Sequence, residues 1–186
     1  MKKGFTMIEL IFVIVILGIL AAVAIPRMNA TRDDAEAVKA ATNLNVAMSD
    51  ISTYYISQGQ FTDMNKMTGV LKDDKGGVIA NGLEGHLIVK NQDCFKVTAV
   101  ETAGDVPAHI VIEKGTSTNA ICATSAAQPG IKSLLTSSFS YSTVDTANNN
   151  TPITKTMGDA NPATAKGYVR VGGTGVNFEG TTPATK

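Results

Sequence analysis

The amino-acid sequence predicts an α+β protein in which one very long N-terminal helix packs, by its C-terminal half, on an antiparallel sheet. Two observations support this fold class. A helical pattern of residues runs from the N-terminal region as far as Gly59. After Gly59 the helical period is lost, and short runs of branched apolar residues alternate with turn-forming residues. A sheet laid over part of a long helix is an α+β arrangement.

The composition excludes several classes of function. The chain has 186 residues, enough for one globular domain with a core and one specialised segment. Its 16 basic and 16 acidic residues balance, so no polyanion-binding footprint is visible and no specific nucleic-acid site is expected. Trp is absent, which argues against a stacking platform. Two cysteines and two histidines without local pairing do not supply a zinc site, and we expect no cofactor or metal.

The first element is an apolar run from Phe5 to Ile25. It is interrupted by Thr6, Glu9 and Gly18 only. As a helix it spans roughly 31 Å at about 1.5 Å per residue, which matches the hydrocarbon core of a bilayer. Basic residues precede the run and no acidic residue does, so the N-terminus is predicted to stay cytoplasmic and the rest of the chain to lie outside.

This apolar run has two other possible interpretations. One is a simple signal anchor, and the other is a secretory signal peptide cleaved after Ala24, where Ala22-Val23-Ala24 offers small residues. Spacing alone does not separate the alternatives from a retained helix. Glu9 argues against a disposable signal, because an ionisable residue costs up to about 3 kcal/mol at the bilayer centre, although less near the interface.

An acid at position 9 can pair with a new positive charge if the chain is cut between Gly4 and Phe5. Cleavage leaves a new α-amine on Phe5, about one helical turn from the Glu9 side chain. When such helices pack side by side, the amine of one subunit can meet the carboxylate of its neighbour. A pair of this kind would neutralise both charges in an apolar bundle and fix the axial stagger between subunits.

The N-terminal segment resembles the type IV pilin superfamily, which includes the type II secretion pseudopilins. Lys2-Lys3-Gly4-Phe5-Thr6-Met7-Ile8-Glu9-Leu10 is similar to the family's leader and cleavage site, and the segment from Gly18 to Pro26 is also similar. The resemblance covers about the first 30 residues. It implies that a prepilin peptidase cuts after Gly4 and methylates the Phe5 amine. It also implies that Glu9 serves assembly and that Pro26 bends the helix.

The resemblance implies a pilin-like fold and a structural subunit rather than an enzyme. The expected localisation is a bacterial inner membrane, crossed once with the C-terminal domain periplasmic, and afterwards a pilus or periplasmic pseudopilus. The expected partners are the prepilin peptidase, further copies or other pilins and pseudopilins, and inner-membrane assembly machinery. The alternative from a different functional class is a periplasmic binding module released by cleavage after Ala24.

The process that the filament serves stays open. It can be surface attachment or motility, protein secretion, or DNA uptake. The major pseudopilin of type II secretion usually carries a Pro-Trp-Gly-like motif near its C-terminus, and the absence of Trp counts against that subunit. Glu9 counts against the tip-type pseudopilin, which lacks the acid. Whether the chain is a major or a minor subunit, and what its surface loops bind, stay open.

The helical pattern continues beyond the membrane-length run. No Gly or Pro occurs from Thr31 to Tyr55, and apolar residues recur at steps of three and four: Val38, Ala41, Leu44, Met48, Ile51 and Tyr55. Gly59 is predicted to end the helix. The whole helix would be roughly 80 Å long, too long to be buried by one small domain. Pro26 predicts a kink or local melting near Ala22.

Four segments follow from this organisation: a leader over residues 1–4, a transmembrane or filament-core helix half over 5–25, an amphipathic half over 26–59 and a β-rich domain over 60–186. Three strands are predicted in the domain, at residues 86–90, 95–100 and 109–113. Asn91-Gln92-Asp93 and residues 104–107 are predicted turns, so the strands form an antiparallel meander.

Cys94 and Cys122 flank the last two of these strands. In an oxidising compartment a disulfide between them is predicted. It would close a 28-residue loop and contribute about 3 kcal/mol in the chain-entropy model. The alternative is two buried free thiols.

The C-terminal part is predicted to be a long surface excursion over residues 133–166, rich in Ser, Thr and Asn, with one short helix around residues 131–136. A final hairpin is predicted from residues 168–171 and 176–178, followed by a frayed tail over 180–186. His86 and His109 are isolated in the sequence, and neither belongs to a catalytic motif. The segment from Asp73 to Gly77 is interpreted as a turn rather than a calcium loop.

Overall fold

The computed structural model describes residues 6–145, 151–158 and 166–171. These residues form two compact units, Met1–Ala35 and Glu36–Lys186, and the long helix α1 (Met7–Gln58) contributes to both. The second unit therefore contains the C-terminal part of α1 together with the β-strands.

The first unit consists of the N-terminal part of α1. Residues 7–25 have a mean hydropathy of 3.1, and by length and composition this stretch can cross a membrane. The helix continues without a break through Ala22 and Pro26, so the predicted local melting near Ala22 is wrong. Proline removes one N–H donor, and the helical residues on either side hold the conformation. A kink at Pro26 stays a prediction.

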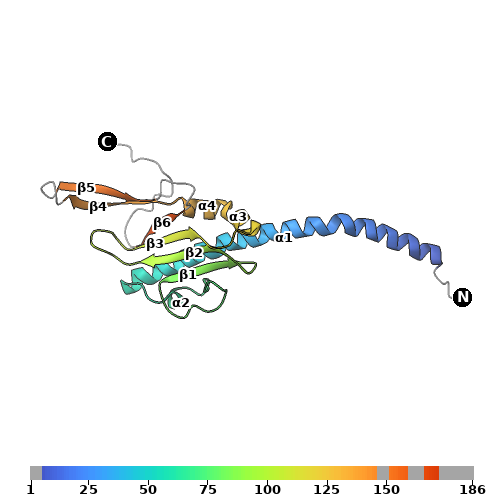
Figure 1. Ribbon diagram of the computed structural model, residues 1–186, viewed down its shortest axis with the longest axis horizontal. Helices are drawn as coiled ribbons and strands as arrows, with labels where there is room; N and C mark the ends of the chain where they lie inside the picture. The colour runs from blue at the N-terminus through green and yellow to red at the C-terminus, as the bar shows by residue number, and fades with distance from the viewer. Residues whose placement is uncertain (1–5, 146–150, 159–165, 172–186) are drawn as a thin grey trace. The chain divides into compact units, whose positions relative to one another are not determined.

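In the second unit, α1 packs one face against the sheet (Figure 1). The fully buried positions are Ala37, Ala40, Leu44, Ala47, Met48 and Ile51. The predicted stripe is correct at its three large aliphatic residues but wrong at Val38, which is 54% exposed. Alanines occupy half of the buried face because a short side chain lets the helix backbone approach the sheet closely. Gly59 ends the helix as predicted, with φ of 74° and its N–H donating to the Tyr55 carbonyl at 2.7 Å.

A four-stranded antiparallel sheet forms the centre of the second unit. Its strands are β1 (Glu84–Val89), β2 (Gln92–Val100), β3 (His109–Lys114) and β6 (Gly167–Arg170), in the order β1-β2-β3-β6 (Figure 1). The predicted meander is confirmed. The first strand of the predicted final hairpin is β6, which pairs with β3. Residues 176–178 and the tail 180–186 lie outside the described residues.

Alternate residues of the strands face α1 and form one core with it. The inward set is Leu87 and Val89 from β1, Phe95, Val97 and Ala99 from β2, Ile110 and Ile112 from β3, and Val169 from β6. This alternation is the period of two that a half-buried strand requires. Packing against the sheet gives this half of α1 a buried face, whereas the apolar residues 7–25 are exposed in the single chain.

The β1–β2 hairpin differs from the predicted one in its turn. Lys90 and Asn91 adopt φ of 47° and 63°, so they form a two-residue turn, and Gln92 and Asp93 belong to β2. The predicted turn at residues 91–93 is therefore wrong. Two consecutive left-handed residues suit the twist of a tight hairpin, and Asn tolerates that conformation well. The pairing also skips Cys94, which is the extra residue of a β-bulge.

Short elements complete the second unit. They are α2 (Met64–Met67), α3 (Ala120–Ala126), α4 (Pro129–Leu135), and a separate two-stranded sheet of β4 (Phe139–Asp145) and β5 (Thr151–Met157). The predicted short helix near residue 131 is confirmed by α4. The segment predicted as a surface excursion also contains two strands that were not predicted, because β4 and β5 lie within it (Figure 1). Threonine and aromatic residues favour strands even where serine is abundant.

Candidate functional site

The candidate site is the beginning of α1, where Glu9 interrupts the apolar run. The Glu9 carboxylate accepts hydrogen bonds from the Thr6 N–H at 2.8 Å and from the Thr6 hydroxyl at 2.7 Å. In return, the Glu9 N–H donates to the Thr6 hydroxyl at 3.3 Å. This reciprocal arrangement is a capping box, with Thr6 as the N-cap and Glu9 three residues later. It satisfies backbone donors that the first turn of a helix leaves free.

Thr6 is a capping residue of the candidate site that was not predicted from the sequence. The signal was present, because Thr6-Met7-Ile8-Glu9 matches the Ser/Thr-x-x-Glu capping pattern directly before an apolar run. The capping box gives Glu9 a local role as the residue that closes the first turn. An acid in the apolar run therefore has two explanations, helix capping and pairing with a neighbouring subunit, and they call for different experiments.

The other predicted residues of this segment are placed as follows. Gly4 and Phe5, the predicted cleavage and methylation residues, lie outside the described residues. Pro26 lies within α1. Their roles stay predictions, and so does the assembly role of Glu9.

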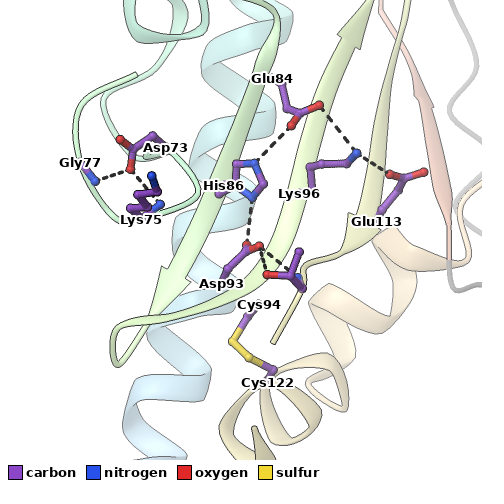
Figure 2. A network of polar contacts seen from close by, with 11 residues as sticks. Asp73, Lys75, Gly77, Glu84, His86, Asp93, Cys94, Lys96, Glu113 and Cys122 are labelled. Atoms are coloured by element: carbon purple, nitrogen blue, oxygen red, sulfur yellow. Dashed lines mark hydrogen bonds and ion pairs between the residues drawn. A yellow bond between two sulfur atoms is a disulfide. The ribbon is translucent and has the colours of Figure 1, made fainter. Parts of the chain in front are cut away.

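The two cysteines form the predicted disulfide. Cys94 and Cys122 are bonded, with their Cα atoms 4.9 Å apart and a sequence separation of 28 residues (Figure 2). Cys94 is the extra residue of the β2 bulge, and Cys122 lies in α3. The bond therefore fastens α3 to β2, close to the β1–β2 turn. The alternative of free thiols is excluded by this geometry.

The residue before Cys94 holds the segment that leads to α3. The buried Asp93 carboxylate accepts hydrogen bonds from the Thr116 N–H at 3.0 Å and from the Thr116 hydroxyl at 2.9 Å. Burial raises the pKa of Asp93, but the hydrogen bonds from Thr116 and His86 lower it, and the net pKa lies below the usual value. Gly115 fits beside Asp93 because a Cβ atom there would lie 2.5 Å from its carbonyl oxygen.

A chain of charged groups crosses the face of the sheet that points away from α1. His86 lies between Asp93 and Glu84, and Lys96 lies between Glu84 and Glu113 (Figure 2). His86 is therefore not isolated in space, although it is isolated in the sequence. His109 is buried at the beginning of β3, where its Nδ1 lies 2.9 Å from the Pro107 carbonyl oxygen and the centre of its ring lies 5.6 Å from that of Phe139.

The loop after α2 is a turn, as predicted. The Asp73 side chain accepts from the Lys75 N–H at 3.0 Å, and the Asp73 carbonyl accepts from the Gly76 N–H at 3.1 Å (Figure 2). The carboxylate is thus used in holding the turn itself. Within the described ranges, no three His, Cys, Asp or Glu side chains gather as metal ligands would.

Residues 1–25 match the family described as the prokaryotic N-terminal methylation motif. This match, together with the relatives below, confirms that the beginning of the chain resembles the type IV pilin superfamily. The matched residues include the whole predicted leader, Glu9 and the apolar run, so the comparison covers the candidate site described above.

Relatives are found among both pilins and secretion proteins. The chain is 39% identical over 70 residues to the type IV major pilin protein PilE1 of Neisseria gonorrhoeae, which covers 38% of this chain and 42% of that protein. It is 40% identical over 80 residues to the type IV major fimbrial protein FimA of Dichelobacter nodosus, covering 41% and 49%. It is 29% identical over 70 residues to the type II secretion system core protein G of Dickeya chrysanthemi, covering 38% and 46%.

In each of these three cases the match spans less than half of the relative's length. No solved structure matches the chain.

Proposed function

We propose that this chain is a structural subunit of a type IV pilus-like filament, processed by a prepilin peptidase and anchored in a membrane before assembly. The observation that carries the proposal is the match of residues 1–25 to the N-terminal methylation motif. The long helix packed by its second half on an antiparallel sheet supports it independently.

Processing is proposed to begin at the leader. The peptidase cuts between Gly4 and Phe5 and methylates the new amine of Phe5. The apolar stretch over residues 7–25 keeps the subunit in the inner membrane, with Lys2 and Lys3 on the cytoplasmic side until the leader is removed. The second unit then lies on the periplasmic side. There its disulfide between Cys94 and Cys122 can form, because that compartment is oxidising.

Assembly is proposed to use Glu9 and the apolar face of α1. All the large apolar side chains over residues 7–25 are exposed in the single chain, so they need either lipid or neighbouring helices around them. In a filament, neighbouring subunits replace the lipid. The Glu9 carboxylate then meets the Phe5 amine of a neighbour, which sets the axial position of each subunit.

The second unit is proposed to act as the outer surface of the filament rather than as an enzyme. The relatives named as pilins and fimbrial proteins support a structural role. Surface loops on such a unit are where partners or the environment are met. One relative is a type II secretion core protein, so a pilus and a secretion pseudopilus both stay open for this chain. The absence of Trp argues against the major pseudopilin.

Shearing cells and sedimenting the released filaments tests the proposal. The expected result is that this chain is a component of the sheared filaments, with the leader removed. Recovery of the chain as a free periplasmic protein beginning at Ile25 would instead support the alternative, a binding module cleaved after Ala24. A surface filament would favour a pilus, and filaments confined to the periplasm a secretion pseudopilus.

A further inference from the structure

The buried histidine of β1 stands between two carboxylates. The His86 Nδ1 atom lies 3.0 Å from an Asp93 oxygen, and its Nε2 atom lies 3.3 Å from a Glu84 oxygen (Figure 2). Both ring nitrogens therefore face acceptors. His86 is 8% exposed, so water does not substitute freely for either partner.

This geometry fits only one protonation state of the ring when both carboxylates are ionised. An imidazolium donates from both nitrogens and satisfies both contacts. A neutral imidazole has one N–H, so one of the two contacts would set a nitrogen lone pair against a carboxylate oxygen. The Lys96 ammonium, 3.7 Å from the other Glu84 oxygen, is the neighbour expected beside an ionised Glu84.

The surroundings of His86 carry more negative than positive groups. Lys72, in the loop after α2, forms two backbone hydrogen bonds with His86, both of 2.8 Å. The same segment continues into Asp73 and Asp74, which line a hollow of about 460 Å³ together with His86. On the opposite side, Lys96 separates Glu84 from Glu113. The carboxylates around the ring favour a cation there.

We propose that His86 is a proton-dependent clasp: in its doubly protonated form it joins Glu84 to Asp93, and on losing a proton it releases Glu84. The break falls on Glu84 because its side chain is 52% exposed and water can replace the lost partner. Asp93 is buried, so losing its contact would leave a carboxylate oxygen without a donor. The neutral ring therefore keeps its N–H on Nδ1.

The clasp connects parts of the second unit that are far apart in the sequence. Asp93 also holds Thr116, and the Ser117 N–H donates to the Asp93 carbonyl at 3.0 Å, directly before α3 and its disulfide. The contact of His86 with Asp93, which both protonation states keep, ties β1 to this segment, and protonation adds only the contact with Glu84 within β1.

The direction in which the stability changes with pH follows from the form of the His86 ring that contacts Glu84. The contact between Glu84 and the ring belongs to the doubly protonated form, so this contact is present in acid and is lost as the pH rises. Asp93 acts in the opposite sense. Its lowered pKa gives stability that is present above the ordinary aspartate value of about 3.9 and is lost as the pH falls.

The test uses the full chain in detergent micelles and follows the ring nitrogens of His86 by NMR between pH 5 and 9. In the wild type both nitrogens are expected to be protonated at the acid end. The variant Glu84→Gln is expected to lower the midpoint of the His86 titration by about half a pH unit, a threefold loss of proton affinity, as for a half-exposed ion pair. An unchanged or raised midpoint would overturn the proposal.

Glu113→Gln is the matched control, because Glu113 pairs with Lys96 but does not contact the histidine ring. It removes the same charge and is expected to shift the midpoint less than Glu84→Gln does. Equal shifts in the two variants would mean that His86 responds only to the overall charge of the face, which would also overturn the clasp.

A second measurement gives the energetic coupling. Thermal unfolding of the wild type, Glu84→Gln, His86→Gln and the double variant forms a double-mutant cycle at pH 5.5 and pH 9. The coupling between the two positions is expected to be favourable at pH 5.5 and to vanish at pH 9. A coupling that is equal at both values, or larger at pH 9, would contradict the clasp.

Discussion

The carboxylate of Glu9 and the backbone N–H of Thr6 lie 2.8 Å apart, and the Thr6 hydroxyl lies 2.7 Å from the same carboxylate oxygen. The residue proposed to pair with a neighbouring subunit thus also closes the first turn of its own helix. Pairing with the amine of a neighbour has to share or replace these bonds. The two roles differ in one respect, because capping needs an acceptor at position 9 and pairing needs a negative charge.

Glu9→Gln should separate the two roles. A glutamine keeps the acceptor of a capping box but carries no charge. If charge pairing drives assembly, removing one partner of a buried pair costs about 3–5 kcal/mol per contact, so filament yield should collapse. The measurement is the amount of the chain in sheared filaments relative to the membrane fraction.

Glu9→Ala is the companion variant, since it removes both the charge and the acceptor. The pairing account predicts equal loss of filaments in the two variants, with membrane insertion intact. Normal assembly of Glu9→Gln combined with failure of Glu9→Ala would show that capping, and not charge, is what assembly requires.

Thr6→Ala should loosen the beginning of α1. It removes the hydroxyl that donates to Glu9 and accepts from its N–H, and the loss of an N-cap costs about 1 kcal/mol. Hydrogen exchange of the amides in the first turn should accelerate by roughly fivefold, as that free energy implies. Thr6→Ser, which keeps the hydroxyl, should exchange like the wild type. Acceleration in both variants would point to the lost methyl group instead.

Breaking the disulfide should destabilise the second unit by about 3 kcal/mol, because a 28-residue loop is released in the unfolded chain. Thermal unfolding of the full chain in detergent, with and without reductant, measures this effect. The double variant Cys94→Ala/Cys122→Ala should unfold at the temperature of the reduced protein and should not respond to reductant. A double variant as stable as the oxidised wild type would show that the bond adds nothing to stability.

Gly167→Ala should be strongly destabilising. A Cβ atom at Gly167 would lie 1.7 Å from the Leu134 carbonyl oxygen, so β6 and α4 would have to separate, at a cost of about 1–3 kcal/mol or more. Thermal unfolding checks this expectation. Gly69→Ala is the matched control, since no atom lies within 4 Å of the Cβ position there, and its unfolding temperature should hardly change. Equal effects in the two variants would mean that the clash with Leu134 does not decide the stability.

The sequence was sufficient to predict the long helix and the first three strands, because each has a strong local signal. The disulfide was predictable for another reason, since the chain has two cysteines and the expected compartment is oxidising. The period of the helix continues to Gly59, and branched residues mark the strands. Val38 is exposed although it is large and apolar, and the smaller Ala37 and Ala40 lie on the buried face instead. Which face a helix buries depends on how closely its backbone can approach the sheet, and that distance is a property of the packed structure.

Other features depend on contacts between distant residues. The ribbon of β4 and β5 is rich in serine and threonine, and its strands are evident only through their mutual pairing. The chain of charged groups lies on the face of the sheet that points away from α1. It depends on the strand register that brings His86 beside Asp93, and this register follows from the bulge at Cys94. In the candidate site, the sequence was sufficient to predict the capping box, because Thr6 and Glu9 lie within one helical turn of each other.

The mass of the mature N-terminus tests the central proposal most directly. The chain is purified from the membrane or filament fraction of its own host, and its N-terminal peptide is sequenced by mass spectrometry. The account predicts that the mature chain begins at Phe5 and carries one methyl group on the α-amine. A mature chain that begins at Ile25, or one that retains Met1 to Gly4 in assembled material, would contradict it.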